Sequence, residues 1–104
     1  MRVADLGLDV RRLAALCQQY GVSKLEAFGS FVRGDATLDS DLDLLVTYEP
    51  GRTVGLAFVA LQQELEALAG RRVDLLTRKA VETSPNKYFR RFALRQTEPL
   101  YEHA

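Results

Sequence analysis

The sequence predicts an α+β fold in which helices cover a small mixed β-sheet. Segments whose apolar residues recur at helical spacing alternate along the chain with short apolar runs that are typical of strands. Glycine closes most of these segments. The chain has 104 residues and is 47% hydrophobic, which is enough for one core and too little for a second. We therefore expect residues 1–104 to form a single domain.

The first predicted element is a helix over residues 9–20. Asp9 is placed to cap its N-terminus and Gly21 to end it. Its apolar stripe consists of Leu13, Leu16, Cys17 and Tyr20. Because Cys17 falls on this stripe and has no second cysteine to pair with, we expect a buried thiol in the core.

Three short apolar segments, residues 24–28, 42–48 and 71–77, are typical of strands, and residues 98–102 could add a short edge strand. Residues 30–34 have room for only about one helical turn before Gly34 ends it. In the third strand Val73 and Leu75 would face one way, and Asp74 with Leu76 the other.

Two longer helices complete the prediction. The first spans residues 54–69, with Thr53 as its cap and Gly70 at its end. Its apolar face consists of Phe58, Leu61, Leu65 and Leu68. The second begins with Ser84 as cap and Pro85 in its first turn, and runs to about residue 95. Its basic residues are expected on a solvated face and its aromatic residues in the core, although such a helix could also grip a polyanion or an acidic partner.

Two aspartates, Asp41 and Asp43, stand at the start of the second strand. Residues i and i+2 of a strand face the same side, about 6.6 Å apart, so the two carboxylates would project together and repel each other. A hard cation such as Mg²⁺ relieves that repulsion and commonly joins protein carboxylates to substrate phosphates. The alternative interpretation is a pair of solvated turn and strand-start residues.

The Gly29-Ser30 pair favours the phosphate interpretation. Ser30 lies eleven residues before Asp41. A glycine admits close approach of a ligand to the backbone, and free N–H groups at a helix start bind anions. Asp74 on the third strand supplies a third carboxylate, unless it is simply an exposed residue of a sheet edge. Arg33 lies three residues beyond Ser30, where it could contact phosphate or pair with a nearby aspartate.

The motif block, GSFVRGDATLDSDLDLLV, resembles the DNA polymerase beta-like nucleotidyltransferase superfamily, and most closely the minimal nucleotidyltransferase (MNT) proteins of prokaryotes. The resemblance covers about residues 22–77 and includes the GSxxRG form that contains Arg33. It implies a polymerase beta-like fold with the carboxylates Asp41, Asp43 and Asp74 as ligands of two Mg²⁺ ions. It also implies that the phosphates of a nucleoside triphosphate contact Gly29, Ser30 and Arg33.

MNT proteins commonly work beside a HEPN-domain toxin and act as antitoxins that transfer AMP from ATP to a toxin tyrosine. The resemblance therefore implies a protein adenylyltransferase in which Asp74 either binds metal or assists deprotonation of the acceptor hydroxyl. Two alternatives stay open. One is a non-catalytic module that neutralises its partner by binding, and the other is a nucleotidyltransferase for a small hydroxyl compound such as an aminoglycoside.

Composition limits the other partners. Fourteen basic and fourteen acidic residues give a formal net charge of zero, so we do not expect nucleic acid as a direct partner. No run approaches the ~20 apolar residues that span a bilayer, and no basic stretch precedes an apolar N-terminal segment. We expect a cytoplasmic protein without membrane contact.

Overall fold

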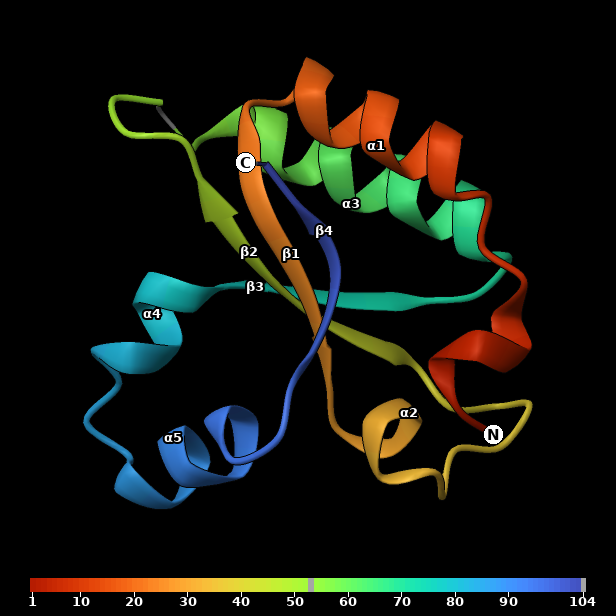
Figure 1. Cartoon of the computed structure of the whole chain (residues 1–104). Coiled ribbons are helices and arrows are strands. Elements are labelled where there is room, and N and C mark those ends of the chain that lie inside the picture. Colours follow the sequence, from red (N-terminus) through yellow and green to blue (C-terminus); the bar gives the residue numbers. More distant parts are fainter. Residues whose placement is uncertain (53, 104) are drawn as a thin grey trace.

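The computed structural model describes residues 1–52 and 54–103, and its centre is a four-stranded sheet. The strands are β1 (Val22–Phe28), β2 (Leu42–Tyr48), β3 (Val73–Thr77) and β4 (Glu98–Glu102), in the order β3-β2-β1-β4. β1 pairs antiparallel with both β2 and β4, whereas β2 and β3 are parallel. The predicted small mixed sheet is confirmed (Figure 1).

The helices lie on both faces of the sheet. On one face pack α1 (Val10–Gln19) and α3 (Leu56–Ala69), which contact each other (Figure 1). On the other face lie α4 (Arg78–Glu82) and α5 (Lys87–Leu94). Two short helices, η1 (Val3–Leu6) and α2 (Ser30–Arg33), complete the fold, and α2 directly follows β1. No helix in the described ranges is long and apolar enough to cross a membrane.

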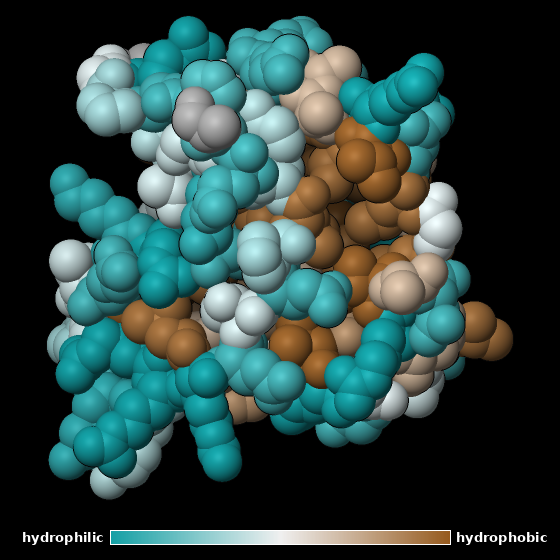
Figure 2. Space-filling model, in the orientation of Figure 1, coloured by the Kyte–Doolittle hydropathy of each residue, from teal (hydrophilic) through white to brown (hydrophobic). Residues whose placement is uncertain are grey.

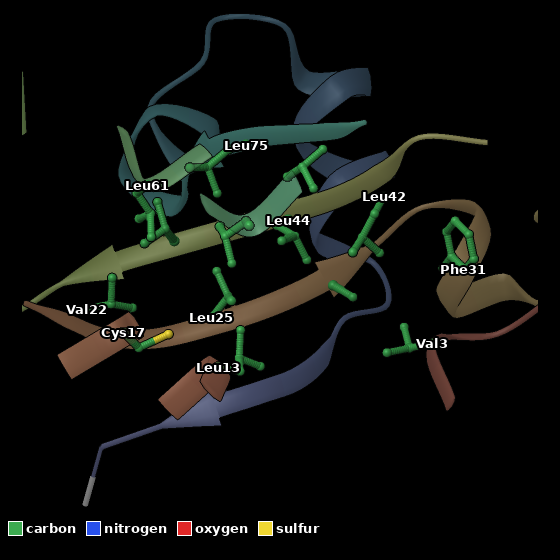
Figure 3. Close-up of a cluster of buried hydrophobic side chains, with 14 of the residues drawn as sticks. Val3, Leu13, Cys17, Val22, Leu25, Phe31, Leu42, Leu44, Leu61 and Leu75 are labelled. Carbon is green, nitrogen blue, oxygen red and sulfur yellow. The ribbon is translucent and has the colours of Figure 1, made fainter. Parts of the chain in front are cut away.

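The main core fills the space between the sheet and the α1–α3 layer (Figure 3). Alternate strand residues point into it, and Leu25 and Leu44 are almost fully buried there. Cys17 is also fully buried, and burial raises the pKa of its thiol to about 12. The predicted core position of Cys17 is therefore confirmed.

A smaller core lies on the opposite face, beneath α4 and α5. Its buried members are Phe28, Leu45, Val81 and Ala93. Phe28 and Leu45 reach this face because strand side chains alternate, so each sits next to a residue of the main core. The sheet therefore carries apolar residues on both of its faces.

Several predicted boundaries agree with the structure. Asp9 caps α1, since its Oδ1 accepts hydrogen bonds from the backbone N–H groups of Arg11 and Arg12, both at 3.1 Å. The second strand matches its predicted bounds, and β4 forms the edge strand that the sequence suggested. Gly34 ends α2 in a left-handed conformation with φ 96°.

Other boundaries were wrong by about two residues. β1 begins at Val22 rather than residue 24, β3 begins at Val73 rather than residue 71, and α3 begins at Leu56 rather than residue 54. Gly55 is the residue that precedes the first turn of α3. The predicted cap Thr53 lies outside the described residues.

The C-terminal helical region differs most from the prediction. It holds two helices, because α4 follows β3 immediately with the Thr77 side chain as its cap. Asn86, not Ser84, caps α5: its Oδ1 accepts from the backbone N–H groups of Tyr88 and Phe89, both at 3.1 Å. Pro85 therefore stands before the cap instead of inside the first turn.

Candidate active site

The predicted acidic residues lie at one end of the strands, where β2 and β3 begin. Asp43 and Asp74 are register partners across the parallel β2–β3 pair, and Phe28 of β1 is the partner of Asp43 on its other side. Leu42 and Leu44 enter the main core, so Asp43 faces the opposite side of the sheet. Asp41 directly precedes β2 and is exposed.

The Gly-Ser turn touches this acidic cluster. Gly29 has φ 76° and ψ −146°, a backbone conformation that is essentially restricted to glycine. A Cβ atom at this position would stand 2.3 Å from Oδ2 of Asp43, so only glycine lets the carboxylate lie against the chain. Ser30 follows as the first residue of α2. Gly29 and Asp43, which are fourteen residues apart in the sequence, are therefore in contact in the structure.

The electrostatics of the site follow from this crowding. The pKa of Asp43 is raised from 3.8 to about 6, first by burial, then by the negative charges of Asp74 and Asp41, while Arg33 acts in the opposite direction. Like charges that raise a carboxyl pKa also create a favourable place for a cation. A perturbed carboxylate beside an open turn is typical of a functional site.

The donor set fits Mg²⁺. It consists of carboxylate oxygens alone, which suit a hard cation that keeps several waters and binds through one or two carboxylates plus substrate phosphates. The described residues hold no ready-made group of three metal-ligating side chains. Asp41 pairs with Arg72, with Oδ1 3.1 Å from Nε. Because the Arg72 side chain is 80% exposed, this ion pair is weak and easily exchanged for a metal.

The raised pKa of Asp43 gives a stability prediction for Asp43→Asn in metal-free buffer. The folded-state pKa of about 6 exceeds the unfolded value of 3.8, so ionisation of Asp43 opposes folding. The penalty is absent below about pH 4 and complete above about pH 7. At pH 7.5 we expect Asp43→Asn to stabilise the fold by up to about 3 kcal/mol. Urea unfolding of both proteins at a series of pH values measures this difference in the free energy of unfolding.

In that experiment Asp39→Asn is the matched control, because Asp39 is an exposed turn residue and its substitution should change stability by no more than about 0.5 kcal/mol. The gain from Asp43→Asn should shrink steadily as the pH falls from 7 to 4. A gain that is independent of pH would show that charge repulsion at Asp43 is not its cause.

Arg33 forms the ion pair with a nearby aspartate that the sequence allowed, and its contact with phosphate stays a prediction. Its Nε lies 3.3 Å from Oδ2 of Asp35, and both side chains are exposed, so the ion pair holds it weakly. Its guanidinium also lies over the Phe92 ring, 5.2 Å from the centroid. Arg33 is therefore directed toward α5.

A pocket of about 400 Å³ opens between α2 and α5 and includes Gly29 in its wall. Its lining residues are Gly29, Arg33, Phe92, Arg95 and Gln96. Figure 1 shows α2 and α5 at the same end of the molecule, near the end of β1. The sequence analysis did not assign the α5 residues to the site, although the basic and aromatic composition of this helix was the available signal.

The prediction for the aromatic residues of the last helix was wrong in part. Phe89 packs against the smaller core, as expected. Tyr88 and Phe92, however, are 71% and 54% exposed. The helix is only two turns long and meets the sheet through Phe89, Ala93 and Leu94, so the other aromatic rings remain at the surface.

A buried ion pair ties the α4–α5 layer to the sheet. Glu26 of β1 has a side chain only 3% exposed, and its two carboxylate oxygens accept from Nη1 of Arg78 at 3.0 and 2.8 Å. Thr97, between α5 and β4, donates its hydroxyl to the same carboxylate at 3.0 Å. Lys24 adds a longer contact of 3.7 Å. This network holds both ends of the α4–α5 segment against β1.

Comparison with known proteins supports a common fold and chemistry. The family model described as a nucleotidyltransferase domain matches residues 11–98. The protein adenylyltransferase MntA of Thermococcus cleftensis is 43% identical over 68 residues, which are 65% of this chain and 68% of that protein. The solved structure of a minimal nucleotidyltransferase is 37% identical, with a TM-score of 0.71, and the match covers 95% of this chain and 96% of that chain.

A crystal structure of a toxin–antitoxin complex with AMP-PNP also has the same fold. Its TM-score is 0.67, and the match covers 92% of this chain and 75% of that chain. The sequence identity is 19%, so this likeness concerns the fold alone.

Proposed function

Since this chain belongs to the nucleotidyltransferase domain family, we propose that it transfers AMP from ATP to a hydroxyl group of a partner protein. Family membership confirms the predicted fold class, and with it the assignment as a nucleotidyltransferase. The nucleotide, the acceptor and the residue roles are the proposal. We also propose that residues 1–104 act as one catalytic domain in the cytoplasm, where ATP is available.

The observation that carries the proposal is the contact between Asp43 and Gly29. A carboxylate with a raised pKa lies against a turn that only glycine can form, with Asp74 in register beside it. A metal bound at the carboxylate and a phosphate bound at the turn would therefore be neighbours. That adjacency is what transfer of a nucleotidyl group requires.

We assign Asp41, Asp43 and Asp74 as the ligands of two Mg²⁺ ions, and Gly29, Ser30 and Arg33 as contacts of the triphosphate. Bound Mg²⁺ would stabilise charge on the attacking and leaving oxygens of an in-line displacement. The acceptor oxygen forms a bond to the α-phosphorus while the bond from that phosphorus to pyrophosphate breaks.

The acceptor hydroxyl loses its proton in that displacement. Asp74 is exposed at the start of β3, so its carboxylate can accept this proton when it is not occupied as a metal ligand. Asp43, which is half-buried against Gly29, is better placed to hold a metal beside a phosphate bound at the turn than to meet an acceptor from solvent.

We propose a tyrosine of a HEPN-type toxin as the acceptor, so that the protein acts as an antitoxin. The relative from Thermococcus cleftensis is a protein adenylyltransferase by name, and a solved toxin–antitoxin complex of MntA and HepT shares this fold. AMP-PNP in a related complex supports ATP as the nucleotide. A zero formal net charge is compatible with a protein acceptor.

The test compares ATP labelled at the α-phosphate with ATP labelled at the γ-phosphate. The protein, Mg²⁺ and the purified product of the neighbouring gene are incubated with each, and protein-bound label is measured. We expect label from the α-position only, release of one pyrophosphate per transfer, and no transfer with excess EDTA. Transfer of the γ-label would identify a kinase and contradict the proposal.

A further inference from the structure

The pocket between α2 and α5 brings together two guanidinium groups from distant parts of the chain. Arg33 comes from α2 and Arg95 from the end of α5, and Phe92 lies between these elements in the wall. We propose that Arg95, acting with Arg33, binds the β- and γ-phosphates of the nucleotide and makes the protein selective for triphosphates. This inference rests on the proposed nucleotidyl transfer and adds a residue to it.

The position of the pocket supports a polyphosphate as its ligand. Gly29 belongs both to the pocket wall and to the contact with Asp43. If the α-phosphate lies beside the Asp43 carboxylate, the next two phosphates must continue into adjacent space. The pocket of about 400 Å³ is open space of this kind that begins at Gly29 and ends at Arg95.

The two charged side chains that line the pocket, Arg33 and Arg95, are positive, as phosphate binding requires. Among the described residues, Arg33 forms one ion pair, the exposed one with Asp35, and Arg95 forms none. Figure 2 shows hydrophilic side chains gathered over the end of the molecule that carries α4 and α5. Guanidinium groups bind phosphate oxygens in a bidentate manner, and a site with two of them favours more than one phosphate.

The pocket is less suited to a nucleobase. A base that stacked on this face of Phe92 would have to displace the Arg33 guanidinium, which lies over the ring 5.2 Å from its centroid. Phe92 instead supports the Arg33 guanidinium at the pocket wall. Gln96 adds a neutral amide donor beside Arg95.

Arg95 is held in place by the chain on both sides of it. Its backbone N–H donates to the carbonyl of Arg91 at 2.9 Å, and Thr97, two residues later, is fixed to the buried Glu26. Phe92 lies one helical turn before Arg95 and lines the same pocket. The backbone that carries Arg95 would thus already be in place before nucleotide binds, and its exposed side chain would order on the phosphates.

The test is calorimetric titration of Mg²⁺-saturated protein with ATP, AMP and inorganic pyrophosphate. We expect Arg95→Gln to weaken binding of ATP and pyrophosphate at least about tenfold and to leave AMP binding within about twofold. Arg95→Lys, which keeps the charge but not the bidentate fork, should recover part of the loss. Arg91→Gln, on the same helix but outside this pocket, is the matched control and should leave all three affinities within about twofold.

The outcomes separate this inference from the function on which it rests. Wild-type binding of ATP together with unchanged binding by Arg95→Gln would overturn the role of Arg95 alone. An equal loss of ATP and AMP affinity would also overturn it, because the residue would then act on the fold or on the nucleoside. Wild-type protein that binds neither ATP nor pyrophosphate would overturn the proposed function and this inference together.

Discussion

Replacing Asp43 with asparagine is expected to reduce the rate of AMP transfer by at least about 1,000-fold while the protein stays folded. Asparagine keeps the shape of the side chain against Gly29 but removes the charge that would hold Mg²⁺ beside the α-phosphate. Single groups that stabilise transition-state charge contribute about 10²- to 10³-fold, and a metal ligand also positions both reactants. Initial rates of α-label transfer measure the loss, with circular dichroism to establish the fold.

Asp39→Asn is the control for this comparison, because it removes a turn carboxylate only two residues before Asp41 and should leave the rate within about twofold. Asp41→Asn should follow Asp43→Asn. A transfer rate above about a tenth of wild type in both Asp41→Asn and Asp43→Asn would contradict the site assignment. If the double variant still neutralises the partner protein, stoichiometric binding explains that neutralisation better than catalysis.

The opposite effects expected for Asp43→Asn on rate and on stability have one physical origin. Burial and neighbouring carboxylates raise the pKa of Asp43, so the metal-free fold carries a charge that it does not favour. A protein that only needed to fold would be better served by a neutral residue at this position. The destabilising charge is understandable if the working state contains a cation, since stability is commonly lost to function at active sites.

Local sequence patterns predicted most of the fold, because capping residues and apolar periodicity act between residues that are close in the chain. Asp9 caps α1 as expected, since an aspartate before an apolar helical stripe has few other roles. The C-terminal helices were predicted less well, because Ser84 and Asn86 are both good caps two residues apart. Tertiary packing of Phe89 and Ala93 on the sheet decides which cap is used, and that information is not local.

The candidate site divides in the same way. Asp41, Asp43 and Gly29 lie within a short segment whose spacing predicts them as site residues, and the structure places Gly29 against Asp43. Arg95 could not be assigned from sequence, because its proximity to Gly29 depends on how α5 packs after three intervening helices and two strands. Glu26 was also missed: its partner Arg78 is 52 residues away, so no local spacing relates them.

Replacing Arg78 with alanine is expected to destabilise the protein by about 3 kcal/mol, the largest stability loss among these variants. The change leaves the carboxylate of Glu26 buried, with only the Thr97 hydroxyl and a Lys24 ammonium 3.7 Å away to compensate it. The α4–α5 layer should loosen first, because Arg78 begins α4. Urea unfolding gives the free energy, and hydrogen exchange of α4 and α5 amides locates the loss.

A double-mutant cycle separates the charge from the packing of the Arg78 side chain. Glu26→Gln in the Arg78→Ala background removes the uncompensated charge and should restore at least half of the lost stability, because a neutral amide is far less costly to bury. Lys79→Ala, the next residue of α4 and exposed, controls for truncation of a basic side chain on the same helix. If Glu26→Gln restores nothing, the loss arises from packing of the Arg78 stem, and the ion pair is not what fastens α4 and α5 to the sheet.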